Sequence, residues 1–366
     1  MCGPVVPQPL AEAPWALTRL RPDLAWPLTK GAGVTVAVID SGVSPDHPSL
    51  SGKVLPGLDL VPQSIAPDSA GQCDENGHGT LIAGIIAGRE TISAGFRFYG
   101  VAPEASVVPV RVLRDERRSF DESLSARIAT AVRWAVDTGR AGVINLSLTT
   151  SPTPDLEAAI RYALDHRVVV VAASGNDGDA KPGEPSYPAA YDGVVAVASV
   201  DAQGRHVDSS TVGSYVDIAA PGVRIAGPAA AGGGYLFSEE GGTSFATAYV
   251  SGVAALIRSY EPDLTPAQVA DRLTRTAEHP AEHWNQQVGF GLVDPARAVG
   301  SLGLAAGGRP VPPDGLGRPA AARSDRDLAV AATWIGVVGG TVVVLLLVAL
   351  PVVRLGRKRG WRSARL

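Results

Sequence analysis

The sequence predicts an α/β protein in which helices cover both faces of a doubly wound, mainly parallel sheet, followed by one transmembrane helix. Short apolar runs alternate with helical patterns from Gly33 onward, which is typical of βαβ units. The length of 366 residues suits one α/β domain of about 250 to 300 residues with appendages. A late stretch of 26 uncharged residues exceeds the roughly 20 that span a bilayer.

Five runs rich in Val, Ile and Ala are the predicted strands. Runs that are apolar at nearly every position are typical of parallel strands buried on both faces. They lie at 34–39, 107–112, 143–148, 168–173 and 194–200. The predicted helices lie at 80–87, 123–138, 154–166, 243–259 and 266–276. We therefore expect a single doubly wound domain over 31–299.

Composition and motifs exclude two classes of function. A net charge of −4 argues against a generally basic nucleic-acid-binding protein, so we predict no nucleic-acid partner. No glycine-rich phosphate loop follows the first strand, which argues against a carbohydrate or nucleotide enzyme built on this type of sheet.

The C-terminal part predicts a membrane anchor. The uncharged stretch is 328–353, and a buried core helix is its alternative interpretation. Six cations follow it, against four in the twenty residues before it, so the tail at 354–366 is predicted to be cytoplasmic and the large domain extracytoplasmic. The segment 300–327 has no hydrophobic period and is predicted to be a flexible linker.

The N-terminal extension, 1–30, lacks the signal that such a topology requires. It has no basic region followed by an apolar region. We therefore expect a signal peptide to be missing, either through a start codon placed too far downstream or through removal. A tail-anchored protein with a cytosolic domain is the alternative, but it would put the basic tail on the wrong side of the membrane.

The chain has two cysteines, Cys2 and Cys73. An even, minimal count in an exported domain favours one disulfide, and two unrelated thiols are the alternative.

Four polar residues stand at strand ends or helix starts, where a doubly wound sheet places its site. These residues are Asp40, His78, Asn176 and Ser244. An Asp, a His and a Ser can form an acyl-transfer triad, in which Ser attacks, His moves the proton and Asp orients the His. Each residue alone could instead be a turn residue, a helix cap or a solvated loop side chain. Their joint occurrence favours catalysis.

The motifs D-S-G-V, H-G-T, S-G-N and G-T-S-F-A together resemble those of the subtilisin-like serine peptidases, over roughly 31–299. The resemblance implies a subtilisin-like fold, a triad of Asp40, His78 and Ser244, and Asn176 as the side-chain oxyanion donor. It also implies a set of substrate-binding residues, which are Ser147, Leu148, Thr149, Ala173 and Gly175. Related acid-acting peptidases use a Glu instead of the His and an Asp at the oxyanion site, so His78 and Asn176 argue against them.

A narrower resemblance is to the mycosins, the membrane-anchored subtilases of type VII secretion systems. It rests on 14–20, on 26–31, on Cys73 just before the His motif, and on the C-terminal helix with its basic tail. The resemblance implies an N-terminal extension that wraps the catalytic domain and is tied to it by a Cys2–Cys73 disulfide. It also implies exported protein substrates and the secretion machinery as partners, at the cell membrane.

Three departures from the family pattern modify these expectations. Ser49 follows His47-Pro48 where many subtilases have a calcium-binding Asp, so we predict no metal there and no cofactor elsewhere. Thr149 stands where Gly is usual and should narrow the cleft beside the first specificity pocket. Asp177, next to Asn176, would favour a basic or polar group nearby.

The sequence thus predicts a membrane-anchored serine endopeptidase that hydrolyses exported proteins. The alternative is a mainly structural subunit that stabilises a secretion complex, with catalysis secondary. An intact set of triad residues favours retained chemistry, because a pure scaffold would be free to lose His78 or Ser244.

Overall fold

The computed structural model describes residues 2–301, apart from 4, 7, 63, 115–122 and 179–183. The predicted membrane span and basic tail, and nearly all of the predicted linker, lie outside these residues. Within the described part of the chain, no helix is both long and apolar enough to cross a membrane.

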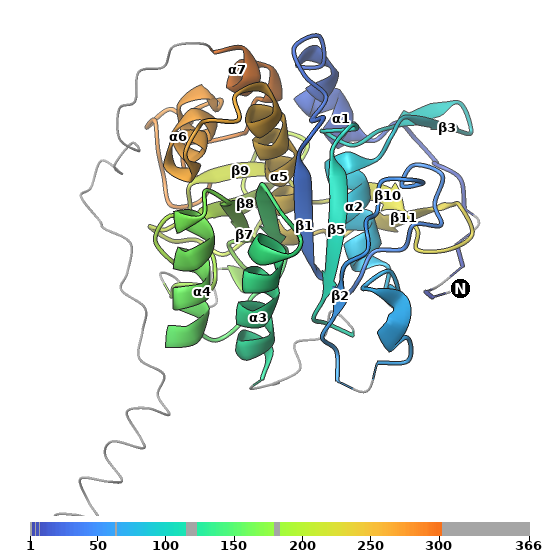
Figure 1. Ribbon diagram of the computed structural model, residues 1–366. Helices are drawn as coiled ribbons and strands as arrows, with labels where there is room; N and C mark the ends of the chain where they lie inside the picture. The colour runs from blue at the N-terminus through green and yellow to red at the C-terminus, as the bar shows by residue number, and fades with distance from the viewer. Residues whose placement is uncertain are drawn as a thin grey trace, which may run out of the picture. The chain divides into compact units, whose positions relative to one another are not determined.

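A seven-stranded parallel sheet forms the centre of the domain, in the order β2-β5-β1-β6-β7-β8-β9 (Figure 1). β1 lies between β5 and β6, with β5 and β2 on one side of it and β6 to β9 on the other, which confirms the doubly wound topology. The strands are β1 (Thr35–Asp40), β2 (Leu58–Asp59), β5 (Ser106–Arg111), β6 (Val143–Leu146), β7 (Val169–Ala173), β8 (Val195–Val200) and β9 (Ile218–Pro221).

The five predicted strands are all present in this sheet, and every residue of β6, β7 and β8 is buried. Their Val- and Ala-rich runs suit a sheet that is covered on both faces. Two edge strands escaped prediction. β2 has only two residues, and β9 is a short I-A-A-P sequence whose proline is compatible with an edge position.

Helices cover both faces of the sheet, as predicted (Figure 1). One face carries α2 (His78–Ala87) and α5 (Thr243–Tyr260), and the other carries α3 (Leu124–Asp137) and α4 (Pro154–Asp165). All ten residues of α2 are buried, whereas α3 and α4 each keep a polar face. The chain continues into α6 (Pro266–Thr276) and α7 (Pro295–Gly300), which pack beside α5.

The N-terminal segment packs on the domain. Its backbone lies beside the hairpin of β10 (Ile225–Pro228) and β11 (Tyr235–Ser238). The Val6 N–H donates to the Ala231 carbonyl oxygen, and the Tyr235 N–H donates to the Gln8 carbonyl oxygen. Further along are α1 (Trp15–Leu20) and the 3₁₀ helix η1 (Pro22–Leu24). A second hairpin, β3 (Thr91–Ser93) with β4 (Phe96–Phe98), and the 3₁₀ helix η2 (Pro67–Ser69) complete the described elements.

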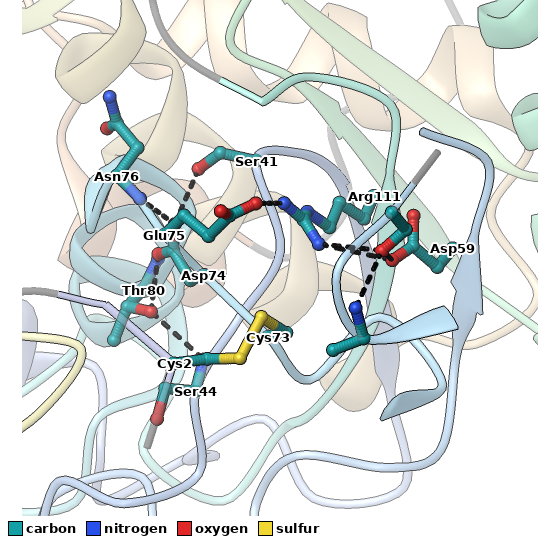
Figure 2. The surroundings of a disulfide bond; sticks show 12 residues. Cys2, Ser41, Ser44, Asp59, Cys73, Asp74, Glu75, Asn76, Thr80 and Arg111 are labelled. Carbon is teal, nitrogen blue, oxygen red and sulfur yellow. Dashed lines mark hydrogen bonds and ion pairs between the residues drawn. A yellow bond between two sulfur atoms is a disulfide. The ribbon is translucent and has the colours of Figure 1, made fainter. Parts of the chain in front are cut away.

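Cys2 and Cys73 form a disulfide that joins this segment to the loop before α2, as predicted (Figure 2). The bridge spans 71 residues of sequence. It fixes the start of the chain beside the His78 motif.

Candidate active site

The topology brings the four candidate residues to one edge of the sheet. Asp40 is the last residue of β1, Asn176 follows the end of β7, and His78 and Ser244 lie in the first turns of α2 and α5. This is the carboxyl edge, beside the central strand at which the strand order reverses. Sites in open α/β sheets form at this place.

Asp40 and His78 are in direct contact. His78 Nδ1 lies 2.7 Å from Asp40 Oδ1, and the Ser41 N–H donates to the same carboxylate oxygen at 2.7 Å. Asp40 is 0% exposed and His78 is 8% exposed. When Nδ1–H donates to this carboxylate, the imidazole carries its acceptor lone pair on Nε2, which is the tautomer that a general base requires.

A glycine allows α2 to approach the loop after β1 this closely. A Cβ atom on Gly79 would lie 2.0 Å from the carbonyl oxygen of Gly42 and 3.3 Å from Asp40 Cβ. Any side chain here would push α2, and His78 with it, away from Asp40. The H-G-T motif therefore has a steric reason for its glycine.

Ser244 is tied to the segment that follows β6. Its hydroxyl donates to the carbonyl oxygen of Ser147 at 3.0 Å, and the Ser147 hydroxyl donates back to the Ser244 carbonyl oxygen at 2.8 Å. The next residue, Phe245, packs against the His78 ring with centroids 5.7 Å apart. The His78 imidazole therefore lies beside the first turn of α5.

The Asn176 amide has a fixed orientation. Its Oδ1 accepts from the backbone N–H and the hydroxyl of Thr243, both at 2.9 Å. The Nδ2 group is consequently the end of the amide that can donate. Asn176 is exposed and lines the same pocket as His78 and Ser244, so a ligand there can reach this donor.

The pocket has a volume of about 200 Å³. Its walls include all five predicted substrate-binding residues, which are Ser147, Leu148, Thr149, Ala173 and Gly175. Asp177 is not among the residues that line it; its N–H donates to the Thr211 hydroxyl.

Comparison with known proteins assigns the chain to a family. The sequence profile of the subtilase family matches residues 31–291. The chain belongs to the subtilase family. The predicted likeness to the mycosins is also confirmed. Mycosin-4 of Mycobacterium tuberculosis strain H37Rv is 38% identical over 76% of this subtilase and 67% of its own length.

Two solved mycosin structures resemble the subtilase in fold. The crystal structure of MycP1 from Mycobacterium smegmatis has a TM-score of 0.72 at 32% identity, covering 85% of this chain and 90% of that one. MycP3, described as a protease from the type VII (ESX-3) secretion system, has a TM-score of 0.69 at 35% identity, covering 82% and 95%.

Sequence reasoning missed several residues of the subtilase pocket. The additional lining residues are Leu113, Leu124, Ser238, Gly241, Thr243 and Phe245. Leu113 follows β5 and Leu124 begins α3, so tertiary packing alone brings them to the cleft. Gly241 directly precedes the G-T-S motif and Thr243 is its second residue, so both could have been included on that ground.

His47 and Ser49, where the subtilase departs from a common calcium motif, contact each other. The Ser49 N–H donates to His47 Nδ1 at 3.1 Å, and the Ser49 hydroxyl lies 2.8 Å from the same atom. Burial lowers the pKa of His47 to about 4. Among the described residues, no group of three or more His, Cys, Asp or Glu side chains is arranged to hold a metal ion.

Proposed function

We propose that this subtilase is a serine endopeptidase with Ser244 as nucleophile, His78 as general base and acid, and Asp40 as the orienting carboxylate. The observation that carries the proposal is the buried Asp40–His78 contact in a pocket that Ser244 and Asn176 also line. Ser, His and Asp in such an arrangement perform acyl transfer.

The proposed reaction has two halves. Ser244 Oγ attacks the peptide carbonyl while its proton passes to His78 Nε2, and Asp40 stabilises the resulting imidazolium. Asn176 Nδ2 donates to the oxyanion of the tetrahedral intermediate, and the positive end of α5 adds to its stabilisation. His78 then protonates the leaving amine, and a water molecule repeats the sequence on the acyl-enzyme to release the acid.

The walls of the pocket suggest which peptides fit. Leu113, Leu124 and Leu148 provide apolar surface, which favours an apolar residue upstream of the cleaved bond. Thr149 provides a branched side chain where related enzymes have a glycine, so the adjoining pocket should favour small side chains.

Hydrolysis of an unfolded protein tests the proposal. Ser244→Ala should reduce turnover by a factor on the order of 10⁶, because the reaction loses its nucleophile. Ser259→Ala is the matched control, since Ser259 lies in the last turn of the same helix and bonds the Ala32 carbonyl oxygen. Ser259→Ala should retain wild-type turnover. Equal cleavage by wild type and Ser244→Ala would contradict the proposed nucleophile.

We further propose that the enzyme is anchored in the cell membrane by 328–353, with its catalytic domain extracytoplasmic, and acts on exported proteins in a type VII secretion system. The Cys2–Cys73 disulfide supports an exported domain, because such bridges persist in oxidising compartments. The likeness to MycP3 supports the secretion role. In spheroplasts, added protease should digest the catalytic domain and spare the tail. The reverse pattern would contradict this topology.

A mainly structural role is the second candidate, and the same variant separates the two. Ser244→Ala removes one oxygen and should leave packing intact. Secretion restored by Ser244→Ala in a deletion strain would assign the secretion role to structure. Secretion restored only by wild type would assign it to hydrolysis.

A further inference from the structure

Asp74, directly after the disulfide cysteine Cys73, is a buried carboxylate that the proposed chemistry does not use. It is 0% exposed. Five hydrogen bonds reach it, three to Oδ1 from the Ser41 hydroxyl and the N–H groups of Asn76 and Gly77, and two to Oδ2 from the N–H and hydroxyl of Thr80. Figure 2 shows Asp74 with Ser41, Asn76 and Thr80 around it. All five donors are neutral, so these hydrogen bonds compensate the Asp74 charge through dipoles.

These donors come from the two segments that carry Asp40 and His78. Ser41 follows Asp40, donating to it through its N–H and to Asp74 through its hydroxyl. The Ser41 oxygen also accepts from the N–H of Gly79, the residue after His78. The carboxylate therefore ties the end of β1 to the first turn of α2.

Asp74 also replaces a missing helix cap. The residue at the N-cap of α2 is Gly77, which has no side chain to accept from the first turn. The Asp74 carboxylate accepts from the Gly77 and Thr80 N–H groups instead, at 2.8 Å each. A carboxylate at a helix N-terminus is further stabilised by the helix dipole.

The neighbouring charges are paired with one another. Glu75 forms an ion pair with Arg111, whose side chain is 0% exposed and also contacts Asp59 (Figure 2). Among the residues that the structure describes, Asp74 has no such partner, and burial raises the pKa of its carboxyl. A buried charge opposed only by neutral donors is costly, and such groups concentrate where geometry serves function.

We propose that Asp74 is a positioning residue for catalysis, which acts through Ser41 and the first turn of α2 to hold His78 against Asp40. This inference rests on the proposed peptidase function. An amide at this position would direct its NH₂ group against one of the donors that the carboxylate now accepts from. The first turn of α2 would then shift, and His78 with it. A misplacement of about 1 Å in a catalytic group costs on the order of 100-fold in rate.

The test compares Asp74→Asn with Asp217→Asn. Asp217 is also a buried carboxylate, but its Oδ2 accepts from the Ala196 N–H near the start of β8, at the opposite edge of the sheet. Active sites are first counted with a fluorophosphonate, and kcat, KM and the pH profile are then measured per active site. Both variants should lower the unfolding midpoint.

Only Asp74→Asn should lower kcat per active site, by about 100-fold with KM nearly unchanged. The acid limb of its pH profile should move to lower pH, because an imidazolium that contacts Asp40 less closely has a lower pKa. A normal kcat and an unmoved acid limb in folded Asp74→Asn would overturn the proposal. Equal kcat losses in Asp74→Asn and Asp217→Asn would also overturn it, since they would indicate a general structural effect.

Ser41→Ala provides a second variant if Asp74→Asn fails to fold. It removes the hydroxyl that links Asp74 to the Asp40 segment and to the Gly79 N–H, and it leaves the bonds from the Gly77 and Thr80 N–H groups to Asp74 in place. It should shift the acid limb in the same direction with a smaller loss of kcat, and an unchanged profile would overturn the proposal. Wild type and Ser244→Ala are assayed alongside. If wild type itself is inert, the peptidase function fails; if wild type is active and the Asp74 and Ser41 variants are normal, only the positioning role fails.

Discussion

The two halves of the candidate active site are built differently. Ser244 and Asn176 are held by short hydrogen bonds among the ends of β6, β7 and α5, such as those between Ser244 and Ser147. Asp40 and His78 lie beside the loop before α2. The Cys2–Cys73 disulfide joins this loop to the N-terminal segment, and the Arg111–Glu75 ion pair joins it to the end of β5. We refer to these as the helix-held half and the tethered half.

The difference separates chemistry from stability. In the helix-held half, the side chains that would contact the substrate belong to the packed core elements, so single substitutions there should reduce turnover more than stability. In the tethered half, the disulfide and the ion pair lie outside the pocket, so their loss should reduce stability more than turnover.

The largest expected effect on stability is loss of the disulfide. Cys2→Ser combined with Cys73→Ser should lower the free energy of unfolding by about 4 kcal/mol, because the bridge closes a loop of 71 residues in the unfolded chain. Turnover per folded molecule should stay near wild type at temperatures well below the transition. Chemical denaturation measures the first quantity and an active-site titration the second. A large loss of turnover in the folded variant would erase the distinction between the halves.

Substitution of Asn176, in the helix-held half, should reduce turnover and leave stability nearly unchanged. Asn176→Ala should lower kcat by about 100 to 1000-fold, roughly 3 to 4 kcal/mol, with little change in KM, because one oxyanion donor is lost. Asn176→Asp sharpens the test, since it keeps an acceptor for Thr243 but has no amide donor. It should be as impaired as Asn176→Ala. Recovery of activity in Asn176→Asp would assign Asn176 a capping role instead.

The smallest effect concerns His47, which belongs to the tethered half through its edge contact with Tyr235 beside the N-terminal segment. Its folded pKa of about 4 lies below the ordinary value of 6.5, so the unfolded chain binds the proton more readily between these values. The contribution of neutral His47 to the free energy of unfolding is complete above pH 6.5. It is lost as the pH falls towards 4, by up to about 3 kcal/mol.

His47→Gln should flatten this pH dependence, and unfolding midpoints measured between pH 4 and 7 check it. His166→Gln is the control, because His166 is exposed at the end of α4 and should leave the dependence as in wild type. An unchanged slope in His47→Gln would show that another group causes the acid sensitivity.

The same division explains what the sequence could predict. The helix-held half lies on strands and helices with clear apolar patterns, so Ser244, Asn176 and the five cleft residues could be placed together from their motifs. The tethered half depends on distant contacts. Asp74 looks like an ordinary loop acid in the sequence D-E-N-G, and its burial results from the close approach of α2 to the loop after β1, which Gly79 allows.

The N-terminal segment and edge strands show the same limit. β9 and β10 are four-residue elements, and α1 has six residues, too few for a periodic pattern to emerge. Their partners lie elsewhere in the chain: β9 pairs with β8, β10 pairs with β11, and Trp15 of α1 donates to the Val223 carbonyl oxygen. Sequence patterns predict elements that are stabilised by their own periodicity, and these elements are not.

Labelling with a fluorophosphonate followed by peptide mapping tests the central claim most directly. The probe should modify Ser244 alone, and His78→Ala should abolish labelling because the hydroxyl loses its base. Asn176→Ala should still be labelled at Ser244, since its nucleophile remains activated. Failure of the wild-type protein to react, both with its N-terminal extension intact and with it trimmed, would contradict the peptidase assignment and favour the structural role.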